Sequence, residues 1–565
     1  MHNSKILQGL NLESEYSTIK VSLPGQHIDE ITTILEKITA FHPIFIQEYI
    51  ISPTELIIRS KLPFVWKECV DTFQKLSTRE ITAKKAHEYI IGVVINKKIK
   101  SMSTIPLLYC AHKSNIETTS LLENILLKDI KDGFRSVFNR YYIMGCGKGN
   151  QITGSIASTR DAYLAQNIQK DKWSTNVLIQ RLNLPMPKWQ ILSNITELED
   201  CWGEYQKPVV IKPTGLVGGH GVVVGLNTLE EAKEAFKFAV QATEIKTRSS
   251  WQKKIMIQEQ VKGEDYRLLV IDGKLEIATK RIPAFVTGDG KHTIEELIND
   301  TNKDPRRDIS NPAHILKPII IDAPLKNLLK KNSLTLESIP EKDSRIYVRD
   351  IASMSQGGIT EDFTDSVSKE IKLLVESIAH SIHAFALGVD VMCLDLSKPL
   401  TKDNGAILEV NTMPESYLNF YPTIGEQRGY VADIYIKKLL KDNISKKLVL
   451  IGQTENDLPT LLRKKWGFNK DSVIGELKES GYIINGKEIN DVENWNRSLD
   501  ALKCNGLLDI LIVHYRDWKD VENKGLGFDH IDTLYVTKDM KDEKEYIKIV
   551  KKYRRMKLID NIKYI

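Results

Sequence analysis

Short runs in which apolar residues dominate, at 17–23, 44–50 and 89–95, predict three strands in the first part of the chain. At 28–38 and 119–127 apolar residues instead recur every three or four positions, and this spacing predicts two helices. Strand and helix signals that follow one another in this way indicate a domain of the α/β class.

The chain divides into three parts on the same grounds. Its 565 residues are too many for one hydrophobic core. The glycine-rich loops that carry candidate chemistry lie in the middle, and a basic stretch at 437–447 leads into a strand-like run at 447–452. We therefore predict an amino-terminal α/β domain at 1–165, a middle domain at 166–443 and a final α/β segment at 447–565.

Composition narrows the function classes. Hydrophobic residues make up 42% of the chain and charged residues 27%, which is typical of a globular protein. The net charge of +5 is small beside 79 basic and 74 acidic residues, and aromatic residues reach only 7%, so nothing favours nucleic-acid binding. The six cysteines lie far apart without a C-x-x-C pair, which favours reduced thiols. With no apolar signal core and no long apolar run, the sequence predicts a soluble, cytoplasmic protein without a membrane segment.

The stretch "GAILEVNTMP" (405–414) places a carboxylate and an amide at the end of an apolar strand. Glu409 and Asn411 are two positions apart, so their side chains share a face. Asp395 ends the preceding strand-like run, and we expect neighbouring antiparallel strands to bring these three side chains together. Oxygen ligands of this kind suit Mg²⁺, which proteins commonly share with phosphate. A hydrogen-bonded strand end without a metal is the alternative.

A glycine-rich segment, "KPVVIKPTGLVGGHGVVVG" (207–225), joins two strand-like runs. Its first run delivers Lys212, and its glycines allow backbone N–H groups to approach phosphate oxygens. The segment lacks the Gly-Lys-Ser/Thr of a Walker loop and opens no helix. It predicts either a lid over a nucleotide or an ordinary glycine hairpin.

A third segment, "IMIQEQVKGEDYRLLVIDGKL" (255–275), predicts two strands joined by a turn at Gly263. Gln258 and Glu259 end the first strand, and Asp265 and Arg267 begin the second. A polar pair at a strand end can read the edge of an adenine, and a carboxylate can accept hydrogen bonds from ribose hydroxyls.

These elements, in this order, resemble the ATP-grasp superfamily of carboxylate–amine ligases, and more closely the amino-terminal half of cyanophycin synthetase. The resemblance covers most of residues 140–440. It is carried by the segments already quoted together with "LPMPKW", "RIPAFVTGDGKHTIEELI", "NKDPRR" and "SQGGITEDFTD". It implies an ATP-grasp core of α+β type with flanking α/β domains.

The resemblance implies a role for each matching residue. The residues expected to bind ATP are Lys172, Lys212, Gly218, Gly219, His220, Gly221, Gln258, Glu259 and Asp265. Magnesium, expected as two ions, would be held by Asp395, Glu409 and Asn411. The residues expected to act in catalysis are Lys212, Arg267 and Arg281, with Arg281 facing the acyl phosphate. The substrate-side loops match at Arg306, Arg307, Ser355, Gly357 and Gly358. His220 stands near the position of an arginine in the usual family loop.

The reaction implied by the resemblance is transfer of the ATP γ-phosphoryl group to a carboxylate, followed by attack of an amine. Positioning and electrostatics do most of the catalysis in such a transfer. The products are an amide, ADP and phosphate, and the substrates are amino acids or short peptides. Enzymes of this type are commonly dimers or tetramers, so we expect a homo-oligomer with small-molecule partners.

The final segment resembles a truncated Mur ligase that has lost its P-loop. After the strand "KLVLIG", Glu455, Asn456 and Asp457 stand where a P-loop needs lysine and a hydroxyl. We predict a remnant without ATPase activity, and an unrelated α/β cap is the alternative. At the other end of the chain, "GCGKGNQITGSIASTRD" (145–161) matches the family's linker into the ATP-grasp domain; its glycines could form a phosphate-binding nest or a turn between domains.

Two other functions remain open from the sequence. One is a tripeptide ligase similar to glutathione synthetase. The other is a catalytically dead ATP-binding scaffold protein, which the altered glycine loop and the lost P-loop suggest.

Overall fold

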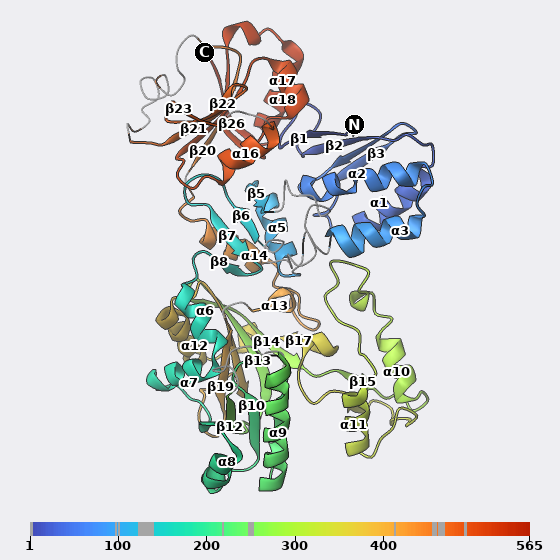
Figure 1. Cartoon of the computed structure of the whole chain (residues 1–565), viewed down its shortest axis with the longest axis vertical. Helices are drawn as coiled ribbons and strands as arrows, with labels where there is room; N and C mark the ends of the chain where they lie inside the picture. Colours follow the sequence, from blue (N-terminus) through green and yellow to red (C-terminus); the bar gives the residue numbers. More distant parts are fainter. Residues whose placement is uncertain are drawn as a thin grey trace. The chain divides into compact units, whose positions relative to one another are not determined.

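A computed structural model of the chain describes residues 4–95, 99, 102–121, 141–216, 220–246, 254–411, 414–443, 445–454, 460, 469, 471–490 and 494–565 (Figure 1). The chain forms two compact units. One comprises Met1–Ser155, Ser310–Ala313 and Ala432–Ile565, and the other comprises Ile156–Ile309 and His314–Val431. The two ends of the chain thus belong to one unit, and the three-domain division stays a prediction.

The first unit begins with an antiparallel sheet of order β1-β2-β4-β3 that carries helices. The strands are β1 (Ser4–Leu7), β2 (Thr18–Ser22), β3 (Glu48–Ile51) and β4 (Glu55–Arg59). The helices are α1 (Asp29–Phe41), α2 (Pro63–Ser77), α3 (Ala83–His87), a π-helical continuation (Glu88–Ile95) and α5 (Thr104–Lys113).

Of the elements predicted here, the strand at 89–95 is wrong. The run is helical and follows α3 directly. Ile90, Ile91, Val94 and Ile95 are buried, at helical spacing. A short, fully apolar run cannot be assigned by periodicity alone, which explains the error. The helix expected at 119–127 lies mostly outside the described residues, and its first residues belong to a strand.

A small sheet follows, in which β6 (Tyr141–Met144) pairs antiparallel with β5 (Thr118–Ser120) and β7 (Gln151–Gly154). A short β8 (Ala157–Ser158) comes next in the chain, and α14 (Tyr430–Leu439) precedes the final segment.

The final segment forms a seven-stranded sheet of order β23-β22-β21-β24-β20-β25-β26. Its interior strand β20 is parallel to both β24 and β25. The strands are β20 (Lys446–Ile451), β21 (Ile474–Lys478), β22 (Gly481–Ile484), β23 (Lys487–Asn490), β24 (Ile510–Tyr515), β25 (Ile531–Val536) and β26 (Ile559–Tyr564). The helices are α16 (Trp495–Cys504), α17 (Trp518–Lys524) and α18 (Lys544–Arg555). Glu455, Asn456 and Asp457 lie outside the described residues.

Residues from the start of the chain complete the core of this sheet. Leu10 is fully buried in the same apolar cluster as Val449, Val513 and Phe528. Its backbone N–H donates to the Phe528 carbonyl at 2.8 Å, and its carbonyl accepts from the Leu526 N–H at 2.6 Å. The amino-terminal and carboxy-terminal segments are therefore packed as one body.

The second unit contains two main antiparallel sheets (Figure 1). The four-stranded sheet has the order β11-β10-β12-β9, from β9 (Trp189–Leu192), β10 (Val209–Pro213), β11 (Val223–Leu226) and β12 (Ile255–Glu259). The five-stranded sheet has the order β17-β14-β13-β18-β19, from β13 (Glu264–Ile271), β14 (Lys274–Ile282), β17 (Ile359–Asp362), β18 (Ala386–Cys393) and β19 (Gly405–Asn411).

Helices cover one face of each main sheet. α9 (Leu229–Lys246) and α8 (Ile195–Cys201) pack on the four-stranded sheet through an apolar cluster that includes Ile211, Phe236 and Ile257. α12 (Lys369–Ile382) packs on the five-stranded sheet through Leu268, Val375 and Val389. The remaining elements are α6 (Tyr163–Lys170), α7 (Lys172–Arg181), α10 (Ile294–Thr301), α11 (Ala323–Lys331), α13 (Tyr417–Phe420) and the pair β15 (Phe285–Thr287) with β16 (Arg345–Tyr347). The opposite faces carry charged residues such as Lys212 and Arg267 beside buried apolar ones such as Met256 and Leu269.

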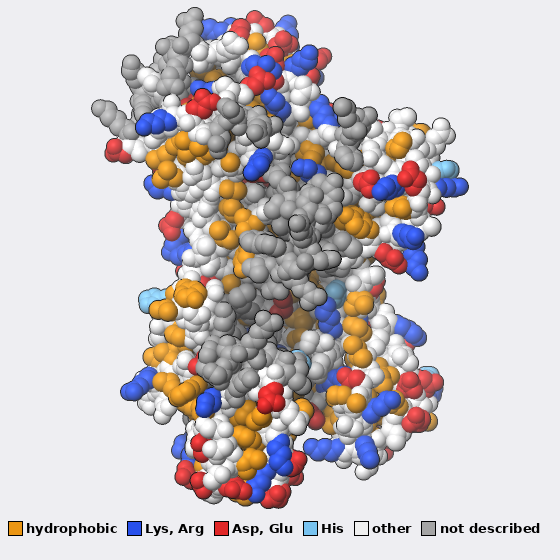
Figure 2. Space-filling view, viewed as in Figure 1, with side chains coloured by type: hydrophobic (Ala, Val, Ile, Leu, Met, Phe, Trp, Pro, Cys, Tyr) orange, Lys and Arg blue, Asp and Glu red, His pale blue; other side chains and the backbone are white. Residues whose placement is uncertain are grey.

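The mixed helix and sheet content confirms the predicted fold class. Basic and acidic side chains are interspersed on the face seen in Figure 2, in keeping with the small net charge. Among the described residues, no helix has the length and apolar character needed to cross a bilayer.

Candidate active site

Charged residues form a row on the face of the five-stranded sheet that points away from α12. Strand register sets Arg267 opposite Asp390, and Asp390 opposite Glu409 on the next strand. Arg281 lies on β14, which pairs with β13 on the side away from β18, and it is opposite Asp265 of β13. Because alternate residues of a strand share a face, Asp265 and Arg267 project to the same side. Sheet geometry alone thus brings three carboxylates and two guanidinium groups together.

Ion pairs connect the members of this row. Arg267 donates from Nε and Nη2 to the two carboxylate oxygens of Asp390, the second at 3.2 Å. Arg281 donates from Nη2 to Asp390 Oδ2 at 3.0 Å and to Asp265 Oδ1 at 2.5 Å. Asp390 therefore receives two arginines, and its side chain is only 10% exposed.

Burial and these ion pairs shift the pKa values of three residues in the row. Burial alone would raise the pKa of Asp390, but Arg267 and Arg281 outweigh it, so the pKa lies below its usual value. For Asp265 burial prevails over the attraction of Arg281, and its pKa is raised. Burial would lower the pKa of Arg281, whereas Asp390 and Asp265 raise it, so the guanidinium stays charged. The site thus presents two guanidinium groups around Asp390, and both lower the pKa of its carboxyl.

Two lysines join this row from the four-stranded sheet and α7. Lys172 begins α7, and its ammonium donates to Glu409 Oε1 at 2.9 Å and to the Leu216 carbonyl at 3.1 Å. Lys212 lies on β10, where burial and the nearby Lys172 lower its pKa to about 8. The predicted lysines thus lie where the two sheets meet, with Glu409 between them and Asp390.

Asp395 does not take the position predicted for it. β18 and β19 run antiparallel, so the residue that faces Glu409 is Asp390, and Cys393 faces Gly405 at the other end of the pair. Asp395 lies two residues beyond Cys393, the last residue of β18, and thus past the end of the strand pair opposite to Asn411. Its carboxylate accepts from Ser397 Oγ at 2.6 Å and pairs with Lys398 at 3.0 Å. The expected grouping of Asp395 with Glu409 and Asn411 is therefore wrong, because consecutive antiparallel strands end at opposite edges.

Asp390 is the residue that the sequence reasoning missed. It stands between Val389 and Val391 inside an apolar run, and its side chain is on the opposite face from those two valines. A lone acidic residue within such a run was the available signal. Asn411, which is opposite Gly388, shares the face of Glu409, as predicted, and of Asp390, which was not predicted.

Gln258 and Glu259 point to opposite faces of β12. Gln258 shares the face of Lys212, because Lys212 is opposite Met256 in the register. Its side chain is 4% exposed, and within the described residues its Oε1 has no hydrogen-bond partner. Glu259 instead accepts from the Gln206 backbone N–H at 3.1 Å. Of the predicted adenine pair, only Gln258 faces the side where Lys212 lies.

The glycine-rich loop is described only in part. Gly218 and Gly219 lie outside the described residues. His220 is exposed, and Gly221 is buried with φ +73°. A Cβ on Gly221 would come within 2.8 Å of Pro213 Cγ and 3.0 Å of Ala242 Cβ, so both its dihedral angle and its packing require glycine.

Three of the predicted substrate-side residues line one cavity of about 290 Å³. They are Arg306, Arg307 and Gly357. The lining also includes Ala284, which lies between β14 and β15, and Ile359 of β17, the strand that carries Thr360. Arg307 is 6% exposed, donates to the Gly357 carbonyl at 3.1 Å, and has an Nε without a partner among the described residues.

The other members of this predicted group have local contacts. Arg306 pairs with Asp304 at 2.7 Å. Ser355 Oγ lies 2.9 Å from Ser353 Oγ, and neither Ser355 nor Gly358 is among the residues that line the cavity.

A second acidic cluster lies apart from this row. Asp362, Asp365 and Glu426 bring carboxylate oxygens close enough to hold a cation. All three carboxylates pair with Arg428, at 2.7, 2.7 and 3.3 Å. Arg428 supplies the positive charge there, so the cluster is an ion-pair network.

Comparison with known proteins agrees with this geometry. Residues 170–285, which hold Lys172, Lys212, Gln258, Arg267 and Arg281, match the model of the phosphoribosylglycinamide synthetase ATP-grasp (A) domain. The chain contains an ATP-grasp domain. The resemblance found in the sequence is thereby confirmed for the ATP-grasp region, while the Mur-like origin of 447–565 stays a prediction.

The curated relatives of this chain include cyanophycin synthetases and glutathione biosynthesis bifunctional proteins. The cyanophycin synthetase of Crocosphaera subtropica is 36% identical over 294 residues, which are 52% of this chain and 33% of the relative. The glutathione biosynthesis bifunctional protein of Enterococcus faecalis is 29% identical over 288 residues, or 50% of this chain and 37% of the relative. A crystal structure of a bifunctional glutathione synthetase from Pasteurella multocida aligns with 66% of this chain and 47% of its own, at 23% identity and a TM-score of 0.46. The chain spans about a third of the length of the curated relatives it matches.

The side chains of the ATP-grasp site suit ATP and Mg²⁺, which ligases with this domain use. The unsatisfied, buried Oε1 of Gln258 can accept a hydrogen bond from an exocyclic amine of a purine. Asp390, Glu409 and Asn411 offer the hard oxygen ligands that Mg²⁺ prefers. Four cations (Lys172, Lys212, Arg267 and Arg281) offset the charge of a triphosphate. The donor set therefore fits both groups.

Proposed function

We propose that the protein is an ATP-dependent ligase that activates a carboxylate by phosphoryl transfer and joins it to an amine, forming an amide. The observation that carries this proposal is the convergence of two lysines, two arginines and two carboxylates where the two sheets of the ATP-grasp unit meet. The names of the relatives support ligation of amino acids or short peptides.

The cations of the site would hold and orient the phosphates. Lys172 and Lys212 lie beside Glu409, and Arg267 and Arg281 lie around Asp390. Positive charge fixed in advance around a transferring phosphoryl group stabilises the negative charge that spreads over its oxygens. Arg281, at the end of the row next to β17, is proposed to face the acyl phosphate.

Magnesium would be held by Asp390, Glu409 and Asn411, with two ions expected. When bound, the metal would supply charge neutralisation between the phosphates. In the free protein Arg267 and Arg281 hold Asp390 in place for that role, and Lys172 does the same for Glu409.

The carboxylate substrate is proposed to enter through the cavity of Arg306 and Arg307. The lining residue Ile359 is opposite Ile282, and the next residue, Thr360, is opposite Arg281. An amino acid or short peptide could thus place a charged end near the unpartnered Arg307 Nε and its reacting carboxylate near Arg281. Ser355 and Gly358 remain proposed contacts of the loop that borders this region.

The test is phosphate release from ATP and Mg²⁺ across a panel of amino acids and dipeptides, each alone and in pairs. Glu409→Gln removes the charge that pairs with Lys172, and Glu361→Gln is the matched control because Glu361 lies on the same sheet at a position that faces away from Arg281. Release that requires a particular pair, disappears in Glu409→Gln and persists in Glu361→Gln would establish the ligase. A dipeptide with glycine as the productive pair would favour the tripeptide ligase. ATP binding without release for any pair would favour the scaffold protein.

The proposal includes a single active site per chain, in a cytoplasmic homo-oligomer that acts on small molecules. The lost P-loop of the final segment motivates the single site. Glu409→Gln should then abolish all ATP turnover, whereas residual turnover would reveal a second site.

A further inference from the structure

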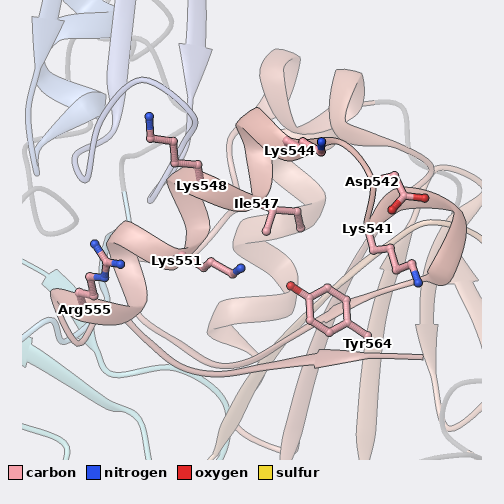
Figure 3. Close-up of a pocket in the computed structure, with 8 residues that line it drawn as sticks. All are labelled: Lys541, Asp542, Lys544, Ile547, Lys548, Lys551, Arg555 and Tyr564. Carbon is pink, nitrogen blue, oxygen red and sulfur yellow. The ribbon is translucent and has the colours of Figure 1, made fainter.

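A pocket of about 530 Å³ lies in the first compact unit, between α18 and β26. Figure 3 shows its lining, which comprises Lys541, Asp542, Lys544, Ile547, Lys548, Lys551, Arg555 and Tyr564. Its volume is within the range of small-molecule sites. Five of these eight side chains are cationic, and one is acidic.

Four of the cations follow one face of α18. Lys544, Lys548, Lys551 and Arg555 are spaced by four, three and four residues, so they lie one above another over about 16 Å of helix. Like charges at this spacing repel and destabilise an isolated helix. A bound anion would remove that repulsion.

The protein does not neutralise these charges itself. Across the described ranges, none of the five cations forms an ion pair or a hydrogen bond with another residue. Other lysines of the same unit do have partners, such as Lys446 with Asp532 at 3.1 Å and Lys148 with Asp509 at 2.9 Å. The pocket therefore concentrates uncompensated positive charge.

The pocket also has apolar and aromatic parts. Ile547 is 7% exposed and lies at its base. The ring of Tyr564 is 48% exposed and projects from β26, with its hydroxyl toward the Lys551 side chain (Figure 3). An exposed aromatic ring beside cations suits a ligand in which a planar ring is attached to anionic groups.

We propose that this pocket binds a small anion with linked phosphates, namely a nucleoside polyphosphate, at a site separate from the ATP-grasp site. The lysines and Arg555 would contact the phosphates, and Tyr564 would stack on the base. Inorganic polyphosphate has the same linked phosphates but no base. The Tyr564 ring should therefore contribute to binding of a nucleoside polyphosphate and not to binding of inorganic polyphosphate.

The experiment is calorimetric titration of the full chain with ATP and, separately, with inorganic tripolyphosphate, both without metal. The pocket variant is Lys548→Ala/Lys551→Ala. The matched control is Lys552→Ala/Arg554→Ala, which removes two charges from the same helix at exposed positions outside the pocket lining.

We expect two ATP molecules per chain for the wild type and the control, and one for the pocket variant. Tripolyphosphate binding at the pocket should weaken at least tenfold in the pocket variant and less than twofold in the control. Tyr564→Ala should weaken ATP severalfold and leave tripolyphosphate unchanged. Equal loss in both double variants, or no loss in either, would overturn the proposal. Equal weakening of both probes by Tyr564→Ala would overturn the assignment of a nucleoside.

Failure of this inference is distinguishable from failure of the proposed function. Lys172→Ala/Lys212→Ala alters the ATP-grasp site in the other compact unit. If only the pocket binds ATP, this variant keeps all binding and the pocket variant loses it. If only the ATP-grasp site binds ATP, Lys172→Ala/Lys212→Ala loses all binding and the pocket variant keeps it. The pocket proposal is then wrong.

Discussion

Asp390 is the residue on which the other charges of the candidate site depend. It accepts from both Arg267 and Arg281, and it lies opposite Glu409, which pairs with Lys172. Removing a carboxylate from a buried ion pair leaves the partner charges unbalanced, which is costly. The arginines around Asp390 would then lose the partner that fixes their orientation.

Asp390→Asn should lower kcat for phosphate release by about a hundredfold or more, because the amide keeps the shape and loses the charge that orients two arginines and would bind metal. Asp395→Asn should change kcat by less than about twofold, because in the described part of the chain its carboxylate contacts Ser397 and Lys398 and no member of the row. Steady-state kinetics of the two variants, each with a thermal melt, make the comparison. Loss of activity in Asp395→Asn with Asp390→Asn active would restore the sequence-based assignment.

The pH dependence of the reaction should reflect Lys212. Its pKa in the free protein is lowered from 10.5 to about 8, first by burial and then by Lys172. The ammonium is therefore charged below pH 8 and becomes neutral above it, which removes a cation from the proposed phosphate site. We expect kcat/KM for ATP, which reports free-enzyme groups, to fall as pH rises through 8. In Lys212→Arg the fall should disappear, and a flat wild-type profile from pH 7 to 9.5 would contradict the assignment.

Single residues also show what the sequence could predict about the site. Lys172, Lys212, Arg267, Arg281 and Glu409 all lie at the row or beside it, as the ordered motifs predicted. The four residues on strands, Lys212, Arg267, Arg281 and Glu409, take their positions from strand alternation, which a sequence displays directly, whereas Lys172 begins helix α7. The assignment of Asp395 failed because it placed the end of one strand beside the end of the next, whereas consecutive antiparallel strands end at opposite edges.

At the scale of an element, β18 has a glycine, Gly388, at the point where the side chain of Arg267 lies against the strand. A Cβ on Gly388 would come within 2.9 Å of Arg267 Cδ and 2.8 Å of Pro414 Cβ. The strand therefore has a glycine where the arginine crosses it.

Gly388→Ala should destabilise the protein by about 1–3 kcal/mol, the usual range for an added methyl in a packed site. It should also lower kcat about tenfold or more, because Arg267 must move away from Asp390. Gly203→Ala is the matched control, since a Cβ there would have no neighbour within 4 Å. Thermal melts and phosphate-release rates measure both effects. Full activity of Gly388→Ala would show that the position of Arg267 is not critical.

Elements differed in how well the sequence predicted them. The run at 17–23 and the helical pattern at 28–38 became β2 and α1, because each has a polar side that reveals its period. The run at 89–95 is apolar on all sides and became helix, since nothing in it distinguishes a buried strand from a buried helix.

At the scale of the whole molecule, the first compact unit is held together by charges from distant parts of the sequence. Lys503 of α16 pairs with Glu117 at 3.0 Å, with side chains 8% and 5% exposed. Lys61 pairs with Asp529 at 3.1 Å. Glu117 also accepts from the Asp529 backbone N–H at 2.6 Å. Pairing between residues this far apart in the sequence has no local signal, which is why the sequence suggested separate terminal domains.

The buried pair of Glu117 and Lys503 should therefore be essential to stability. Burial would lower the pKa of Lys503, but Glu117 raises it above its usual value, so the ammonium is charged in the folded state. Lys503→Met keeps the length of the side chain and leaves Glu117 as a buried, unpaired carboxylate. We expect a loss of about 3–5 kcal/mol in the free energy of unfolding, measured by urea denaturation.

Two companion variants decide whether the unpaired charge of Glu117 causes the loss of stability in Lys503→Met. Glu117→Gln/Lys503→Met should recover most of the loss, because the glutamine oxygen can still accept from the Asp529 N–H without a charge to balance. Lys148→Met breaks the more exposed pair with Asp509, whose side chains are 56% and 21% exposed, and should cost no more than about 1 kcal/mol. If the double variant is no more stable than Lys503→Met, packing of the lysine stem accounts for the loss. If it recovers, a buried charge pair joins the two ends of the chain into one folding unit, and removal of residues 446–565 should then unfold the amino-terminal sheet as well.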